Sequence, residues 1–164
     1  MKLKHLLIFL SLLIIISACG PSTNEIVLVS GIASEDPLNF IWGFAFEGEA
    51  ATSPGPTITV YKGQEVTITF KNEALYEDGR TDTNRHNFLI VADKDGNSSA
   101  MLPLWGAQVG GNTNYDEDIK TGESASITFI PEETGDFYYI CNSQGHFTHG
   151  MWGRLLVLEP EELP

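Results

Sequence analysis

Short runs of β-branched and aromatic residues, separated by Gly, Pro and Asn, follow one another from residue 25 onward. In the run 65–70 polar and apolar residues alternate with a period of two, which is typical of a half-buried strand. The other runs that predict strands are 25–33, 39–46, 57–60, 86–92, 124–130, 136–141 and 152–158. No stretch past residue 25 shows a sustained apolar period of 3.6 residues. We therefore predict a single all-β domain at 25–164, an antiparallel Greek-key β-sandwich of about eight strands.

Two polar connections interrupt this pattern. The segment 72–85 is acidic and contains a turn signal at Asp78-Gly79. The segment 93–121 is much longer, with one apolar group at 101–105 and a flexible Gly110-Gly111 pair. Connections of this length in a compact domain are often functional. We expect the second one either to fold over an edge of the sandwich or to shape a docking surface.

The first 18 residues have the features of an export signal. Lys2 and Lys4 form a positive end, and the apolar run 6–16 is short for a bilayer span. The sequence Ile16-Ser17-Ala18-Cys19 follows directly and resembles a bacterial lipobox, in which the Cys is lipidated and becomes the mature N-terminus. This predicts a lipoprotein signal peptide at 1–18, a tether at 19–24, and an exported protein anchored to a bacterial membrane, facing the periplasm or the cell exterior. A plain secretory signal or an uncleaved anchor is the alternative.

The charge balance is strongly acidic. Without the first 18 residues the chain keeps 7 basic and 22 acidic residues, a formal charge of −15. Such a surface repels nucleic acid and anionic lipid head groups, so neither is an expected partner. It would steer the protein toward basic patches on another protein, or it serves only to keep the protein soluble.

Cys141 is the only thiol that remains after the predicted lipidation of Cys19. A lone thiol in an oxidising compartment is a liability unless a metal ion binds it, or unless it is simply buried and inert. His146 and Met151 follow it in the spacing Cys-x4-His-x4-Met. A thiolate, an imidazole and a weak thioether are ligands of a trigonal copper site with a long axial Met bond. The missing second imidazole is available in Arg85-His86-Asn87-Phe88, at the head of a predicted strand.

The spacing Cys-x4-His-x4-Met with a distant His-Asn resembles the type 1 (blue) copper site of the cupredoxins, and the loop is most similar to that of the rusticyanin and sulfocyanin branch. The passage 54–66, about eighty residues away, is similar to early strands of cupredoxins and multicopper oxidases. The resemblance implies one copper ion, Cu+ or Cu2+, with His86, Cys141 and His146 as strong ligands and Met151 as the weak axial one. It also implies that Asn87 ties the two ligand loops together by hydrogen bonds.

The second histidine of the loop, His149, also lies between Cys141 and Met151, and spacing alone does not exclude it as a ligand. The resemblance favours His146, because a Gly precedes it and the Met follows five positions later. His149 would then be a surface residue near the metal. Five aromatic residues are candidates for the apolar wrapping of the site, although each by itself is more typical of ordinary core: Phe88, Phe137, Tyr139, Phe147 and Trp152.

The number of histidines limits the possible chemistry. Past the predicted signal peptide the chain has only His86, His146 and His149, too few for the trinuclear cluster of a multicopper oxidase or the added catalytic copper of a nitrite reductase. The dinuclear centre of cytochrome oxidase needs two cysteines in the loop. We therefore expect a one-electron carrier between redox proteins, not an enzyme. The alternative is an extracytoplasmic copper-binding or copper-delivery protein, which the presence of only two methionines past that signal disfavours.

Overall fold

The structure is a computed structural model that describes residues 24–36, 39–73, 84–95, 101–112 and 114–160. The predicted signal peptide, Cys19, the tether up to residue 23 and the turn at Asp78-Gly79 lie outside the described residues. In the described part of the chain, no helix combines the length and the apolar character needed to cross a membrane.

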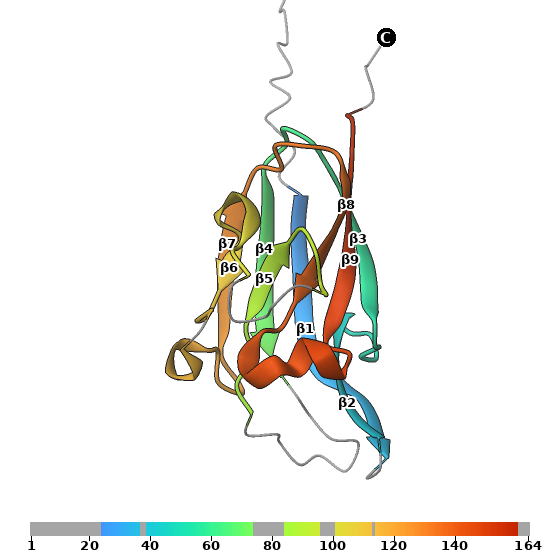
Figure 1. Ribbon diagram of the computed structural model, residues 1–164, viewed down its shortest axis with the longest axis vertical. Helices are drawn as coiled ribbons and strands as arrows, with labels where there is room; N and C mark the ends of the chain where they lie inside the picture. Colours follow the sequence, from blue (N-terminus) through green and yellow to red (C-terminus); the bar gives the residue numbers. More distant parts are fainter. Residues whose placement is uncertain (1–23, 37–38, 74–83, 96–100, 113, 161–164) are drawn as a thin grey trace, which may run out of the picture.

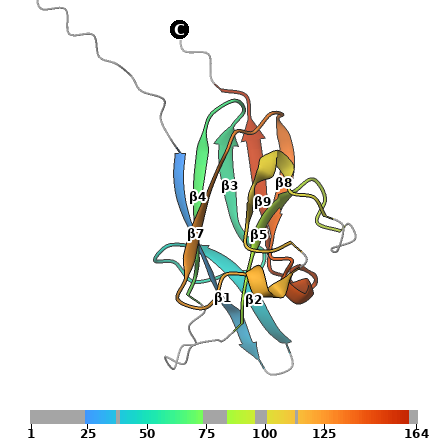
Figure 2. The ribbon, with the colours of Figure 1, turned by 90° about the vertical axis from the view of Figure 1, so that its left-hand side faces the viewer.

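Two β-sheets pack face to face as layers, which are seen edge-on in Figure 2. The first sheet has the order β2-β1-β4-β7, and the second has the order β3-β9-β8-β5-β6. The strands of the first sheet are β1 (Asn24–Asp36), β2 (Asn39–Phe46), β4 (Val66–Asn72) and β7 (Ser124–Phe129). The strands of the second are β3 (Gly55–Tyr61), β5 (Phe88–Val91), β6 (Gln108–Val109), β8 (Gly135–Ile140) and β9 (Trp152–Leu158).

The predicted all-β sandwich is confirmed, and each predicted strand coincides with an observed one. The additional strand, β6, is only two residues long and lies within the long polar connection, where a run that short leaves no readable pattern. Most neighbours are antiparallel, but β1 pairs with β4 and β3 pairs with β9 in parallel. Parallel neighbours arise here because the chain passes from one sheet to the other between these strands.

The core lies between the sheets and follows the period of two. In β4 the residues Val66, Ile68 and Phe70 are fully buried, while the intervening threonines face outward and bond to hydroxyl groups of β7. Burying each such side chain stabilises the fold by roughly 1.5–3 kcal/mol. The centre of the core is aromatic: Tyr139 of β8 packs edge-on against Phe44 and its hydroxyl donates to the Pro56 carbonyl.

Strand β5 is buried on both faces. As alternation predicts, Phe88 and Ile90 face the core between the sheets. The opposite face, with Leu89, packs in a second apolar cluster that includes Met101 and Phe147. Met101 belongs to the long connection and Phe147 to the loop after β8, so the connection folds over the outer face of the second sheet.

Candidate metal centre

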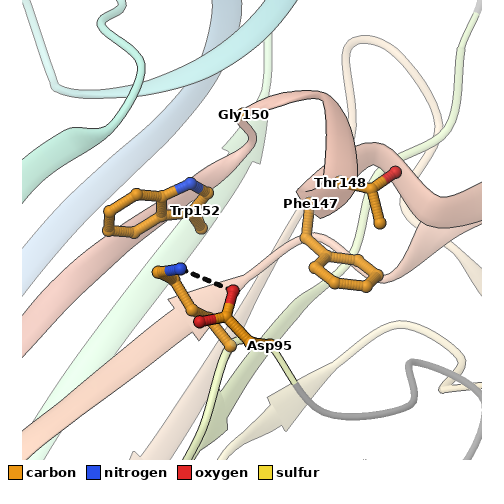
Figure 3. Close-up of a pocket in the computed structure, with 6 residues that line it drawn as sticks. Asp95, Phe147, Thr148, Gly150 and Trp152 are labelled. Carbon is orange, nitrogen blue, oxygen red and sulfur yellow. Dashed lines mark hydrogen bonds and ion pairs between the residues drawn. The ribbon is translucent and has the colours of Figure 1, made fainter.

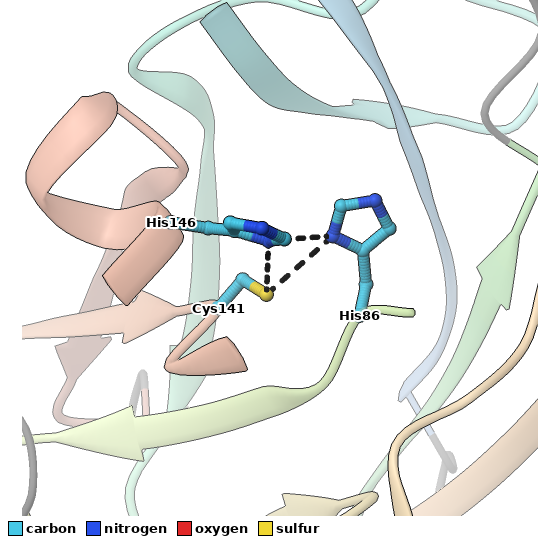
Figure 4. Close-up of side chains that lie close together, drawn as sticks. All are labelled: His86, Cys141 and His146. Carbon is cyan, nitrogen blue, oxygen red and sulfur yellow. Dashed lines mark hydrogen bonds between the residues drawn. The ribbon is translucent and has the colours of Figure 1, made fainter. Parts of the chain in front are cut away.

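His86, Cys141 and His146 come together where β5 begins and β8 ends. This end of the sandwich is opposite the one where β9 ends (Figure 1). The two imidazoles face each other through Nδ1 at 3.1 Å. The Cys141 Sγ lies 3.6 Å from Nδ1 of His86 and 3.5 Å from Nδ1 of His146 (Figure 4). Three donor atoms from two distant segments of the chain thus form a compact triangle.

The backbone holds His86 in place just before β5 begins. Its N–H donates to the carbonyl of Ile119 at 3.1 Å, and its carbonyl accepts from the N–H of Ile119 at 2.9 Å. This two-bond bridge with the long connection fixes the direction in which the His86 side chain leaves the backbone. His86 is fully buried, and Ile119 is half-buried.

Cys141 follows β8 directly, and backbone hydrogen bonds close the loop that begins there. The N–H of Cys141 donates to the Met151 carbonyl at 3.0 Å, and the N–H of Met151 donates to the His146 carbonyl at 3.1 Å. Between them runs the 3-10 segment η4 (Ser143–His149). The spacing of Cys, His and Met therefore has a structural cause: the kinked segment η4, which contains His146, joins Cys141 to Met151, and the backbones of these three residues bond to one another.

Gly150 ends η4 in the left-handed region, with φ of 99°. The Ser53 hydroxyl donates to its carbonyl at 2.8 Å, and a Cβ at this position would lie 2.2 Å from that hydroxyl oxygen. Both the backbone conformation and the close approach of Ser53 require glycine. The loop between β2 and β3 thus anchors the ligand loop immediately before Met151.

The structure separates the two loop histidines. His146 belongs to the triangle, whereas His149 is exposed and its ring lies near Thr148 and the carbonyl of Gly145. This placement agrees with the preference for His146 that the resemblance gave. Met151 is fully buried in the same core cluster as Cys141.

Burial keeps both imidazoles neutral near pH 7. It lowers the pKa of His86 to about 3, assisted by the nearby His146, and lowers the pKa of His146 to about 4, assisted by His149. Burial also raises the pKa of the Cys141 thiol to about 12, although the N–H of Asn87, 3.5 Å from Sγ, opposes this rise. Neutral imidazoles offer lone pairs, and a metal ion is the species that would replace the thiol proton.

The donor set fits copper. Imidazole nitrogen and thiolate sulfur bind a divalent ion such as zinc at about 2.0–2.3 Å, so three donors around one ion lie about 3.5 Å apart. The observed separations of 3.1–3.6 Å are of this size. A buried thiolate with two imidazoles, an apolar surround and a methionine nearby is the set that favours copper over the hard cations, which prefer oxygen.

The aromatic residue that touches the imidazoles is one that sequence reasoning missed. Trp42 of β2 packs edge-on against His86 with ring centroids 5.0 Å apart, and it also lies 5.8 Å from His146. The five aromatic residues considered for the apolar wrapping all belong to the apolar clusters: Phe88, Phe137 and Tyr139 share the one that contains Cys141 and Met151, and Phe147 and Trp152 belong to the second. Trp42 was overlooked because nothing in its own strand marks it as facing the site.

Asn87 joins the two segments that carry the donors, as the resemblance predicted. Its side-chain oxygen accepts from the N–H of Asn142 at 2.6 Å, while its own N–H points at the Cys141 sulfur. These bonds hold the residue after His86 against the residue after Cys141. The relative position of the two donors therefore depends on one buried amide.

A surface cavity of about 460 Å³ lies beside the ligand loop (Figure 3). Phe147, Thr148 and Trp152 line it, together with Gly150 and the ion pair of Lys94 and Asp95. The Lys94 ammonium lies 4.9 Å from the Trp152 ring. None of the three clustered donors lines this cavity, so the donors are closed off from it.

A two-sheet β-sandwich with a buried His-Cys-His-Met arrangement at one end defines the cupredoxin class, and these four residues are arranged as a type 1 copper site. Comparison with known proteins agrees. Rusticyanin of Acidithiobacillus ferrooxidans is 31% identical over 120 residues, which are 70% of this chain and 69% of the relative. Auracyanin-A of Chloroflexus aurantiacus is 25% identical over 168 residues, 96% of this chain and 97% of the relative. The chain belongs to the cupredoxin family and is rusticyanin-like.

Solved structures share the fold. Reduced rusticyanin matches with a TM-score of 0.50 and 21% identity over 84% of this chain and 81% of its own. Auracyanin B matches with a TM-score of 0.50 and 20% identity over 85% and 91%. A multicopper oxidase from Pseudomonas thermotolerans matches with a TM-score of 0.56 and 16% identity over 87% of this chain, but this chain spans only 31% of that enzyme. No family model matches the sequence.

Proposed function

We propose that the protein carries single electrons between redox proteins by way of one type 1 copper ion, and that a lipid on Cys19 tethers it to a membrane. The observation that supports this most is the buried triangle of two imidazole nitrogens and one thiol sulfur, 3.1–3.6 Å apart. His86, Cys141 and His146 would be the strong ligands, and Met151 the weak axial one. A copper ion held there supplies one-electron chemistry by alternating between +1 and +2.

The chain's own part in this function is to keep the donors still. The two-bond bridge at His86 and the bonds that join Cys141 to Met151 restrain both segments in the absence of metal. A site that does not rearrange between oxidation states adds little to the barrier of electron transfer. The side chains of His86 and Cys141 are also shut off from water, which likewise keeps the barrier of electron transfer low.

We further propose that the protein is a carrier and not an enzyme. Multicopper oxidases and a copper nitrite reductase share its fold, but this chain spans less than half of each such relative. Past the predicted signal peptide the chain has one histidine, His149, beyond those of the triangle. With four protein donors and a buried site, no position is left for a substrate. Burial also opposes the ready metal release that a copper-delivery protein needs.

The spectrum of the copper-loaded protein tests this proposal. A thiolate bonded to Cu(II) in a type 1 site gives an intense blue or green charge-transfer band, whereas a labile carrier site is nearly colourless. We expect the wild-type protein to show the band and Cys141→Ser to lose it. A wild-type protein that binds Cu(II) without an intense visible band would contradict the proposal.

The anchor is tested separately. A single acyl chain binds a membrane only marginally, so stable anchoring through Cys19 needs more than one chain on that residue. We expect the wild-type protein in the membrane fraction of the host and Cys19→Ser in the soluble fraction. Wild-type protein found in the soluble fraction would refute the anchor and leave the copper site untouched.

The proposed partners are an electron donor and an electron acceptor with basic docking patches, which the chain past the predicted signal peptide, with 7 basic and 22 acidic residues, would attract. Nucleic acid is not an expected partner. Association steered by charge slows as salt screens it, so the rate of electron transfer with the native partner should fall between low and physiological ionic strength. A rate that is independent of salt would mean that the acidic surface serves only to keep the protein soluble.

A further inference from the structure

A group of buried polar side chains lies directly behind the candidate ligands. Asn87 and Asp118 are only 1% and 4% exposed, and Asn142 and Ser143 are buried with them. These four side chains line a cavity of about 200 Å³ whose other lining residues are also mostly polar. Of the group, only Asp118 carries a carboxylate, and it comes from the long connection that the sequence pattern left uninterpreted.

The buried amide of Asn87 has a defined orientation. Its Nδ2 donates to the Gly111 carbonyl at 2.5 Å and to Asp118 Oδ1 at 3.0 Å, while its Oδ1 accepts from the Asn142 N–H at 2.6 Å. A carbonyl and an ionised carboxylate only accept hydrogen bonds. Rotating the amide by 180° would set oxygen against oxygen at both contacts and nitrogen against the Asn142 N–H. The two acceptors therefore decide which way Asn87 points.

We propose that Asp118 is a positioning residue: its carboxylate fixes the Asn87 amide in the orientation that holds the Asn142 backbone, and through it sets the position of Cys141 relative to His86. The proposal rests on the proposed function, because the positions of Cys141 and His86 matter only if they bind a metal. The hydrogen bonds of Asn87 to Gly111, Asp118 and Asn142, which we call the clamp, are present in the protein without metal. Gly111 supplies the second acceptor, although a backbone carbonyl cannot be removed by substitution. Asp118 is the part of the clamp that a side-chain change can test.

The surroundings of Asp118 suit this role. It follows the 3-10 turn η3 (Tyr115–Glu117), and its N–H donates to the Tyr115 carbonyl at 3.2 Å. The next residue, Ile119, makes the two-bond bridge with His86. One short segment thus holds both the His86 backbone and the Asn87 side chain. Burial raises the pKa of Asp118, and donated hydrogen bonds, including that from Asn87, hold this rise back.

Amide hydrogen exchange in the metal-free protein tests the clamp without reference to copper. In Asp118→Ala the Asn142 N–H should exchange at least about tenfold faster than in wild type, because only the Gly111 carbonyl then holds the Asn87 amide in its orientation. Asp118→Asn keeps an acceptor oxygen of the same size and should stay within about threefold of wild type. Glu133→Gln, which removes an exposed charge in the turn between β7 and β8, is the control and should leave the exchange unchanged.

Copper-loaded protein gives the second readout. Asp118→Ala should shift the thiolate charge-transfer band and change the Cu(II)/Cu(I) equilibrium by about tenfold, or about 59 mV for a one-electron couple, whereas Asp118→Asn should stay near wild type. In an Asn87→Ala background, Asp118→Ala should add nothing further to either quantity, because the two residues act through one contact. Additive effects in this double variant would overturn the proposal.

Three further outcomes are decisive. Unchanged Asn142 exchange and an unchanged band in Asp118→Ala would overturn the proposal. Equal shifts of potential in Asp118→Asn and Asp118→Ala would also overturn it, because the carboxylate would then act by its charge. If Asp118→Ala does not fold, the side-chain NH₂ protons of Asn87 in the wild-type protein decide: protection from exchange supports the clamp, and fast exchange refutes it. If the copper-loaded wild-type protein lacks a blue band, that result refutes the proposed function but not the clamp.

Discussion

The Trp42 ring packs edge-on against the His86 imidazole, with ring centroids 5.0 Å apart, and so closes the metal site from the side of β2. The same indole lies 5.8 Å from the ring of His146 and is only 8% exposed. A strand from the first sheet therefore covers donors that belong to the second. This contact makes the indole a barrier between the imidazoles and water.

Replacing Trp42 by Ala should destabilise the metal-free protein by about 3–5 kcal/mol, the usual cost of removing a buried Trp or Phe side chain. It should also speed the loss of copper to a chelator, because water then reaches the imidazoles. Trp42→Phe should give smaller changes in both. Urea unfolding and the rate of copper loss measure the two effects.

Trp105→Ala is the matched control, because Trp105 packs against Phe129 and Phe137 in the core instead of against the imidazoles. It should lower stability without a comparable effect on the rate of copper loss from the native protein. Equal acceleration in both variants would show that global stability governs the loss, and that Trp42 has no special place at the site.

Gly150 and Ser53 provide a test of how the ligand loop is anchored. Gly150→Ala should cost more than the roughly 1–2 kcal/mol of a left-handed backbone, because its Cβ would also lie 2.2 Å from the Ser53 oxygen. Gly48→Ala is the control, since Gly48 has φ of 84° with open space around it and so reports the backbone cost alone. Chemical unfolding of the metal-free variants gives each free energy.

The double variant separates the two causes. Ser53→Ala alone should cost about 1 kcal/mol for the lost hydrogen bond to the Gly150 carbonyl. Combined with Gly150→Ala it should cost less than the sum of the two, because the oxygen that the new Cβ meets is gone. Simple additivity would mean that the loop moves away from Ser53 without difficulty.

The sequence predicted the strands well because most of them have one buried face. In β4 the alternation of apolar and polar residues can be read directly, and β2 and β9 have the predicted bounds. The donors were also predictable, because Cys141, His146 and Met151 lie in one loop, where their spacing can be read directly. His86 needed the resemblance, since no local pattern links it to a loop 55 residues away.

Apart from Asn87, which the resemblance supplied, the supporting residues of the site could not be predicted. Trp42, Ser53 and Asp118 reach the site from three separate connections or strands, through contacts that only the packing of the two sheets creates. Asp118 stands among other acidic residues in a segment without periodicity, and its burial is invisible in the sequence. Tertiary contacts between distant segments, unlike strand periodicity, leave no local signal.

The two loop histidines should differ sharply in their effect on the copper spectrum. His146→Ala removes a donor of the triangle and should abolish the blue-copper band, whereas His149→Ala removes an exposed ring and should keep it. Visible spectra of both variants loaded with Cu(II) make the comparison, and each serves as the control for the other. Loss of the band only in the His149 variant would reverse the assignment.

The metal-free protein should lose stability as the pH falls from about 6.5. Burial lowers the pKa of His86 to about 3 and of His146 to about 4, against an ordinary value of 6.5. Between pH 5 and 6.5 the unfolded chain therefore binds protons at both residues, while the native protein does not. Each histidine makes the free energy of unfolding fall by up to about 1.4 kcal/mol per pH unit, and this contribution is complete only above pH 6.5.

In His146→Ala, unfolding should take up about one proton fewer than in wild type. The free energy of unfolding of this variant should therefore fall less steeply as the pH is lowered over the same interval. Urea unfolding at several pH values between 5 and 7 measures the slope, and the interval stays above the ordinary pKa of carboxylates. An equal slope in wild type and His146→Ala would mean that the native protein takes up the proton at His146, and that the buried imidazole is not held neutral for a metal.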